Sequence, residues 1–288
     1  MTNESTLRLG LPKGRIQENV LKLLKEAGID VEGAERSYRP TVSIPNTETK
    51  IMKPQNIIEM IDAGSRDIGF GGADWVQELN AEVVELLDTG MNPVRIVAAA
   101  PTSILVDGKL PDRKITIASE YVNLTNKWIK DKNLDANFLR AYGATEVFPP
   151  DDADCIVDNT STGSTLRANN LDIVDTLMTS STRLFANPRA LENKAKLEQI
   201  ENIKLLLESV LEARKRVMLE LNVSSENLEK VVAILPAMNK PTVSTLHNQS
   251  GYSVRAAIKR KDMSDVIPAI KSNGGTDIVV TKFSNIVP

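Results

Sequence analysis

Apolar positions in the first part of the chain alternate between short continuous runs and helical spacings. Leu7–Leu11 is a short apolar run that predicts a strand, and it ends at Pro12-Lys13-Gly14. A helical stripe follows and stops at Gly28; its members are Ile16, Val20, Leu23, Leu24 and Ala27. Pro54 suits the first position of a second helix, whose apolar stripe is Ile57, Ile58 and Ile61.

The pattern continues with further strands. Asp67–Gly72 predicts a strand that runs into a glycine-rich turn, and Val94–Ala100 and Lys114–Ser119 predict buried strands. This β-α-β rhythm is typical of parallel sheets with helices on both faces. In such α/β sheets ligands bind at the carboxyl ends of the strands, where the loops gather.

The last third has a different pattern. Asn187-Pro188 predicts a helix start, and the Leu-, Glu-, Lys- and Ala-rich segment Ala190–Arg214 predicts one long connecting helix. Two helices are then expected among four strands. Ser224 or Ser225 would cap the first, which carries Leu228, Val231, Val232 and Leu235 on one face; the second is Met263–Ser272, although Pro268 lies inside it. The strands are Arg216–Val223, Thr242–Leu246, Ser253–Lys259 and Asp277–Phe283. The order βαββαβ predicts a ferredoxin-like domain.

Composition narrows the function classes. The chain has 288 residues, a length typical of two or three domains, with 41% hydrophobic and 25% charged residues, as in a globular protein. The net charge of −3 argues against nucleic-acid binding through a basic face. The segment MTNESTLRLG has no basic region followed by an apolar one, and no apolar run approaches the length of a membrane span. We therefore expect a cytoplasmic protein without a membrane partner.

The scarcity of cysteine and histidine excludes further classes. Cys155 and His247 are the only residues of their types, so neither an internal disulfide nor a zinc site of the His/Cys type can form. A Ser-His-Asp or Cys-His triad would have to use His247, which follows the stretch TVSTL far from any good nucleophile loop. We expect a surface or turn histidine there, and no hydrolase of that kind.

The most informative segment is Asp154–Leu166, which predicts a strand, a hydroxyl-rich turn around Gly163 and a helix start. Gly163 permits a positive φ, and the backbone N–H groups of Thr162–Thr165 can form an anion site with nearby hydroxyls. Asp154 and Asp158 would repel a phosphate unless they serve sugar hydroxyls or a metal carried by the ligand. The pattern suggests a sugar phosphate, and the alternative is a polar turn that caps an ordinary helix.

Two common phosphate-binding motifs are absent. The P-loop pattern GxxxxGK[ST] occurs nowhere in the chain. Gly69-Phe70-Gly71-Gly72-Ala73-Asp74 is not a dinucleotide-binding motif, since Asp74 stands where the third glycine belongs.

The loop resembles the phosphoribosyl-pyrophosphate loop of the ATP phosphoribosyltransferase family, and further matches follow in order along nearly the whole chain. They are Leu11–Arg15, Asp67–Asp74, Ile115–Thr125, Gly143–Glu146, Leu235-Pro236 and Lys240–Val243. The chain departs from the family in two places. Gly69-Phe70-Gly71-Gly72 replaces the family's GITG and so loses a threonine hydroxyl, and Lys53 stands where many members have an arginine, which loses the bidentate fork.

The resemblance implies a fold of three parts. Two α/β lobes similar to a periplasmic binding protein are expected, with residues 1–95 and the returning segment 180–212 in lobe I and residues 96–179 in lobe II. A ferredoxin-like regulatory domain would cover residues 213–288. The implied activity joins N1 of the adenine of ATP to C1 of phosphoribosyl pyrophosphate and releases pyrophosphate. The implied cofactor is Mg²⁺.

The resemblance also assigns residues to roles. Asp158, Glu146 and Asp154 would serve the ribose, and Ser161, Thr162, Gly163, Ser164 and Thr165 would bind the 5′-phosphate. The ATP or pyrophosphate candidates are Lys13, Gly14, Arg15, Lys53, Asp67 and Gly72, and the alternative for the charged ones is a set of solvated surface charges. Mg²⁺ would be held by the substrate, with Asp158 as the one candidate for a direct ligand.

The third domain is that of the long form of the family. By resemblance it binds histidine as a feedback inhibitor, with Thr242, Val243 and Ser244 as candidate effector contacts. The resemblance also implies that the protein changes between homodimers and hexamers. It implies that the enzyme needs no partner resembling a histidyl-tRNA synthetase. Two other classes remain open: a two-lobed small-molecule binding protein, and an amino-acid sensor without catalysis.

Overall fold

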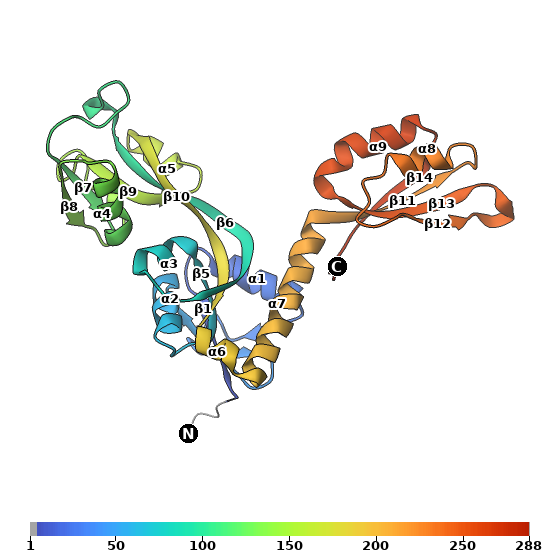
Figure 1. Ribbon diagram of the computed structural model, residues 1–288, viewed down its shortest axis with the longest axis horizontal. Coiled ribbons are helices and arrows are strands. Elements are labelled where there is room, and N and C mark those ends of the chain that lie inside the picture. The colour runs from blue at the N-terminus through green and yellow to red at the C-terminus, as the bar shows by residue number, and fades with distance from the viewer. Residues whose placement is uncertain (1–4, 288) are drawn as a thin grey trace. The chain divides into compact units, whose positions relative to one another are not determined.

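The computed structural model describes residues 5–287, so residues 1–4 of the N-terminal segment discussed above lie outside it. The first 200 residues are built on one eight-stranded sheet in the order β4-β1-β5-β10-β6-β9-β7-β8 (Figure 1). Its strands are β1 (Leu7–Pro12), β4 (Thr47–Met52), β5 (Ile68–Gly72), β6 (Val84–Pro101), β7 (Ile115–Ser119), β8 (Ala136–Arg140), β9 (Cys155–Thr160) and β10 (Leu171–Ala186).

Two long antiparallel strands, β6 and β10, form the centre of this sheet. On one side β10 pairs with β5, next to the parallel strands β1 and β4; we call this half, with its helices, lobe I. On the other side β6 pairs with β9, next to the parallel strands β7 and β8; this half is lobe II. The predicted parallel arrangement is therefore right for the outer strands of each lobe and wrong at the centre.

The glycines after Asp67 lie in a strand and not in a turn. β5 includes Gly69, Gly71 and Gly72, and helix α3 (Ala73–Leu79) starts directly after it. A Cβ atom on Gly69 would lie 2.5 Å from Cγ2 of Ile57, and one on Gly71 would lie 2.7 Å from Cδ1 of Ile58. The missing side chains let helix α2 (Pro54–Asp62) pack closely on β5.

Two longer helices also belong to the lobes, α1 (Gln17–Glu26) and α4 (Val122–Asp131). The other elements are short: helix α5 (Ser164–Ala168), the two-stranded sheet of β2 (Val31–Glu32) and β3 (Thr41–Val42), and the 3-10 turns η1 (Thr102–Ile104) and η2 (Thr145–Val147). Apolar side chains line both faces of the lobe II sheet, with Ile117, Tyr121 and Val157 in one core and Ala118 and Ile156 in the other.

The helical segment that follows β10 is interrupted. Asn187 caps α6 (Pro188–Glu192) by accepting the N–H of Arg189, as its position before proline predicts. The prediction of one continuous helix is wrong, because the helix is interrupted at Asn193. The Asn193 side chain accepts the N–H groups of Ala195 and Lys196, and a new helix, α7 (Lys194–Lys215), starts there.

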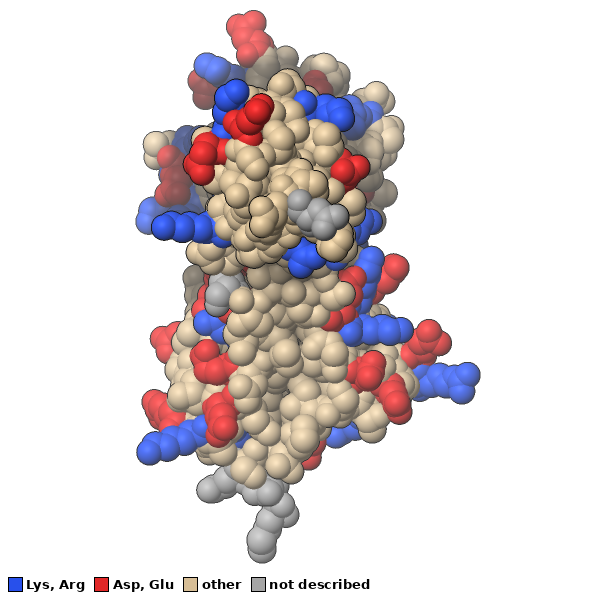
Figure 2. Space-filling view, turned by 90° about the vertical axis from the view of Figure 1, so that its right-hand side faces the viewer, with Lys and Arg blue, Asp and Glu red and all other residues tan. Residues whose placement is uncertain are grey.

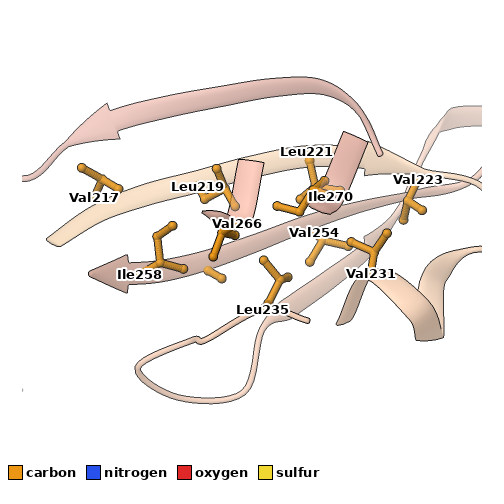
Figure 3. Packing of buried hydrophobic residues seen from close by; sticks show 11 residues of the cluster. Val217, Leu219, Leu221, Val223, Val231, Leu235, Val254, Ile258, Val266 and Ile270 are labelled. Carbon is orange, nitrogen blue, oxygen red and sulfur yellow. The ribbon is translucent and has the colours of Figure 1, made fainter. Parts of the chain in front are cut away.

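The last domain has the ferredoxin-like sheet order β12-β13-β11-β14, with all pairs antiparallel. Its elements are β11 (Arg216–Val223), α8 (Leu228–Ala233), β12 (Thr242–Thr245), η3 (His247–Gln249), β13 (Tyr252–Lys259), η4 (Arg260–Asp262), α9 (Met263–Ser272) and β14 (Thr276–Lys282). Figure 3 shows residues of β11 and β13 facing those of α8 and α9, including Leu219, Val254 and Ile270. Neither predicted serine caps α8, because it begins after Asn227 and no side chain bonds its first turn.

The chain divides into two compact units: residues 1–22 with 29–201, and residues 23–28 with 202–288. On the face drawn in Figure 2, basic and acidic side chains are interspersed. No helix among the described residues combines the length and apolar character that crossing a membrane requires.

Candidate functional site

A cleft of about 560 Å³ lies between the two lobes of the first unit. Lobe I contributes Lys13–Ile16, Lys53–Gln55, Gly72, Asp74 and Trp75 to its walls. Lobe II contributes Glu120, Tyr121, Tyr142, Gly143 and Asn159, and the long central strands contribute Asn92, Val94 and Ser180–Thr182. The cleft therefore opens at the carboxyl ends of β1, β5, β7 and β9, as α/β sheets generally place their ligands.

A buried hydrogen-bond network joins the lobes beneath the cleft. The Tyr121 hydroxyl donates to Oδ2 of Asp74 at 2.8 Å, and the Ser180 hydroxyl donates to Oδ1 at 2.6 Å. The Trp75 ring stacks on Tyr121 with 4.8 Å between centroids. Burial, followed by the charge of Asp74, raises the pKa of Tyr121. Tyr121 thus stays a neutral donor, and the carboxylate of Asp74 is satisfied within the protein.

Glu78 provides a second connection between the lobes. It is buried at the end of α3, and its two carboxylate oxygens accept the N–H groups of Asn123 and Leu124 at 3.1 and 3.0 Å. These groups belong to the first turn of α4, where backbone N–H groups lack helical partners and a negative charge is favoured. Lobe I therefore caps a helix of lobe II.

The predicted phosphate loop lines an adjoining cavity of about 200 Å³ with Glu146, Asp158, Asn159 and the residues Thr160–Thr162 and Ser164–Leu166. Gly163 has a φ of +73° at the start of α5, as predicted. The loop is held by its own hydroxyls: Thr160 accepts the N–H of Gly163 at 3.0 Å, and Thr162 donates to Ser164 at 3.0 Å. Arg167 donates to the carbonyl oxygen of Thr162 at 3.0 Å.

Asp158 lies where the two cavities meet. Its carboxylate accepts the Thr145 hydroxyl and, at 2.6 Å, the N–H of Asn159, a residue that lines both cavities. Burial raises the pKa of Asp158 despite these bonds, and the charges of Glu146 and Glu120 raise it further. This corner of the site therefore has an excess of negative charge, and it favours hydroxyl donors or a cation.

The predicted basic and glycine positions of lobe I come together in the cleft: Lys13, Gly14, Arg15, Lys53 and Gly72 all line it. Nζ of Lys13 donates to the Tyr38 hydroxyl at 2.9 Å and lies 4.7 Å from the centre of that ring. Among residues 5–287, no ion pair to an acidic side chain is found for Lys13, Arg15 or Lys53. Their positive charges are available to an anionic ligand.

Two predicted site residues lie elsewhere. Asp67 is buried before β5, at the opposite end of the sheet, where Arg8 and Lys196 bind its carboxylate at 2.8 and 3.0 Å. Asp154 is at the start of β9 and accepts from Arg113 and from the N–H of Thr116, both at 2.8 Å. Both predictions are wrong for the same reason, because each residue precedes its strand whereas the cleft lies beyond the strand ends.

The candidate effector residues belong to β12, an edge strand paired only with β13. Thr242, Val243 and Ser244 are all exposed. Their proposed contact with an effector stays a prediction.

Several cleft residues were not assigned from the sequence. Asp74, Trp75, Tyr121, Asn159 and Ser180 form or line the cleft floor. The rule that loops after strands carry ligands would have selected Asp74, Tyr121 and Asn159, since each lies at or just beyond a strand end. Ser180 gave no such signal, because it lies inside β10.

Comparisons with known proteins agree over the whole chain. Residues 53–209 match the family described as ATP phosphoribosyltransferase, and residues 213–285 match the family described as HisG, C-terminal domain. A protein named ATP phosphoribosyltransferase from Pelotomaculum thermopropionicum is 38% identical over 98% of this chain and 99% of its own length. Another of that name from Chlorobium luteolum is also 38% identical, with both chains covered completely.

One solved structure is also similar. It is a chain of the ATP phosphoribosyl transferase (HisG:HisZ) complex from Thermotoga maritima, at 28% identity and a TM-score of 0.62. The match covers 70% of this chain and 99% of that one.

The position of Asp67 leads to a stability prediction. Its side chain is only 4% exposed, so Asp67→Asn would leave Arg8 and Lys196 without their anion and should lower the free energy of unfolding by about 3 kcal/mol or more. Urea denaturation at pH 7 measures this loss. Asp154→Asn is the matched control, because its pair with Arg113 is half exposed and should contribute about 1 kcal/mol or less.

The pH dependence of the free energy of unfolding should also reflect the ion pairs of Asp67. Burial alone would raise the pKa of Asp67, but hydrogen bonds from Arg8 and Lys196 outweigh it and hold the pKa below its usual value. The stabilisation should therefore be present above the ordinary aspartate pKa and disappear as the pH falls through the lowered one. Equal losses in the two variants would show that the buried cluster is not special.

Proposed function

Because this chain belongs to the ATP phosphoribosyltransferase family, we propose that its cleft joins N1 of the adenine of ATP to C1 of phosphoribosyl pyrophosphate. The lone pair of N1 forms the new bond to C1 while the C1–oxygen bond breaks, and its electron pair leaves with pyrophosphate. The observation that supports this assignment is the meeting of two cavities at Asn159, one lined by the hydroxyl loop and the other by Lys13, Arg15 and Lys53.

The two cavities suit the two ends of the sugar substrate. The 5′-phosphate would lie on the loop Ser161–Thr165, and the ribose hydroxyls would donate to Asp158 and Glu146. The pyrophosphate and the ATP phosphates would face the three cations of lobe I. The protein would then act by orienting N1 towards C1 and by stabilising the charge of the leaving group.

Mg²⁺ fits this arrangement as a substrate-borne ion. Among the described residues no group of three or more His, Cys, Asp or Glu side chains is placed to hold a metal. Magnesium usually keeps waters and binds through one or two carboxylates and substrate phosphates. Asp158 and Glu146 are the carboxylates beside the loop, and when bound the ion would neutralise the leaving pyrophosphate.

The proposal is tested by measuring pyrophosphate release from ATP and phosphoribosyl pyrophosphate. The assay is run with Mg²⁺ and again after Mg²⁺ has been removed by a chelator. Release should require both substrates and the ion. A protein that binds phosphoribosyl pyrophosphate but never releases pyrophosphate would instead be a binding protein or sensor.

Gly163→Val tests the loop. A valine there needs an unfavourable positive φ, and its Cβ would lie 3.0 Å from Nη1 of Arg167, so the anion contacts should be displaced. Loss of one preorganised contact should slow turnover on the order of a hundredfold. Circular dichroism checks the fold, and near-normal turnover of a folded variant would remove this loop from the site.

The raised pKa of Asp158 predicts an acid limb in the pH profile. The ionised carboxylate accepts ribose hydroxyls more strongly than the protonated group does, so kcat/KM for phosphoribosyl pyrophosphate should fall at a higher pH than an ordinary aspartate would give. Glu146→Gln removes a neighbouring negative charge and should move the limb to lower pH.

Asp158→Asn should abolish this limb and lower kcat/KM by about tenfold to a hundredfold, as expected for a hydrogen bond to a charged group. Asp152→Asn, on an exposed residue before β9, is the control and should leave the profile unchanged. An unshifted limb in Glu146→Gln would contradict the assignment to Asp158.

We further propose that the ferredoxin-like domain carries feedback inhibition by histidine. It has a core of its own, centred on Leu219, Val254 and Ile270, and β12 offers exposed groups at the sheet edge. Histidine should inhibit the full chain but not a chain ending after Lys215, with activity and molecular size measured together because assembly could change. Coupling of about 1–3 kcal/mol is typical of such effectors.

A point substitution tests the edge strand more selectively. Thr242→Trp should weaken inhibition, whereas Thr281→Trp on the opposite edge strand should not. Equal inhibition of the intact, truncated and Thr242→Trp proteins would place histidine at the active site instead.

A further inference from the structure

A strongly basic recess lies in the second unit, where α7 meets the sheet. It has a volume of about 490 Å³ and is lined by five cationic residues and one carboxylate. The cations are Lys215, Arg216, Lys259, Arg260 and Lys261, and the carboxylate is Glu212. This concentration of positive charge occurs in a chain whose net charge is −3. We call it the basic recess.

The fold brings these residues together from two distant segments. α7 ends at Lys215 and β11 starts at Arg216 with no loop between them. Arg216 pairs with Lys259 in the antiparallel ladder, and η4 adds Arg260 and Lys261 immediately after β13. The arrangement is therefore fixed by sheet register rather than by one run of basic sequence.

Most of this charge has no partner in the described part of the chain. Glu212 accepts from Arg216, and Nζ of Lys215 lies 3.8 Å from it. The hydrogen bond from Arg216, with the charges of Lys215 and Lys259, holds the pKa of Glu212 below its usual range, so Glu212 is an anion already shared among the cations. Over residues 5–287 no ion pair is found for Lys259, Arg260 or Lys261.

Capping of α7 does not account for so many cations. A positive side chain near a helix C-terminus is favourable, but Lys215 and Arg214 already provide it from the last turn. Lys259, Arg260 and Lys261 come from another segment, and placing like charges together disfavours the compact state. Their joint position suits an anion that carries several charges.

We propose that the basic recess binds a polyphosphate chain, either free or as part of a nucleotide. Guanidinium groups match phosphate oxygens with two parallel hydrogen bonds, and ammonium groups act as point charges for them. The volume of the recess lies in the range of small-molecule sites. This site is separate from the cleft and does not depend on the function proposed for it.

Calorimetric titration of the full chain with inorganic triphosphate tests the proposal. The titration is made in the Lys13→Gln/Lys53→Gln background, which weakens triphosphate binding at the cleft cations, and again with Gly163→Val, which weakens binding at the loop. Lys259→Gln/Lys261→Gln should weaken the remaining binding by about a hundredfold, since each of the two lost charge-assisted contacts is worth roughly one factor of ten.

Lys230→Gln/Lys271→Gln is the matched control, because it removes the same charge from exposed positions on α8 and α9. It should leave triphosphate binding unchanged. A parallel titration with ATP in the Lys13→Gln/Lys53→Gln background identifies the source: binding that is tighter than that of triphosphate and is weakened by Lys259→Gln/Lys261→Gln supports a nucleotide, and equal binding supports the phosphate chain alone.

Three results would overturn the proposal. One is loss of all triphosphate binding in the cleft and loop backgrounds alone, and another is equal weakening by the recess and control variants. The third is unchanged triphosphate binding with an altered molecular size in Lys259→Gln/Lys261→Gln, which would assign the recess to contact between copies of the chain.

Discussion

The antiparallel pairing of β6 with β10 is the interaction on which the substrate cleft depends. It runs from Val84 opposite Ala186 to Pro101 opposite Leu171. Lobe I attaches to this ladder through β5 and lobe II through β9, so the ladder carries both walls of the cleft. Its register shifts at several places, one of them between Ser180 and Thr182, which line the cleft. Such irregularities bend a strand pair locally, so the ladder can curve between the lobes without losing its pairing.

Two aspartates beside the cleft have different environments and therefore different uses. Asp74 receives hydroxyl donors from Tyr121 and Ser180 and belongs to the floor that connects the lobes. Asp158 accepts hydrogen bonds from Thr145 and Asn159, but its burial and the nearby charges of Glu146 and Glu120 raise its pKa. One carboxylate thus connects the lobes, and the other is the one that we propose for ribose hydroxyls.

The sequence predicted the parts of the fold that depend on local pattern. The strand Arg216–Val223 and the helix Met263–Ser272 occur as predicted, and Gly163 has the expected positive φ. Of the long central strands, β6 was recognised only as Val94–Ala100 and β10 only as the strand returning from residue 180, because their other residues face solvent and cleft in an irregular pattern. Asp67 and Asp154 were misplaced because each lies just before its strand, whereas the cleft lies beyond the carboxyl ends of the strands.

The close packing of Gly71 against Ile58 has a consequence for how this site can diverge. Gly71 belongs to the segment that resembles the family's GITG, in which a threonine precedes the last glycine. A Cβ atom there would lie 2.7 Å from Cδ1 and 3.0 Å from Cγ1 of Ile58. A side chain at position 71 therefore requires Ile58 to turn aside or to be replaced by a smaller residue, because the present packing would otherwise be overfilled.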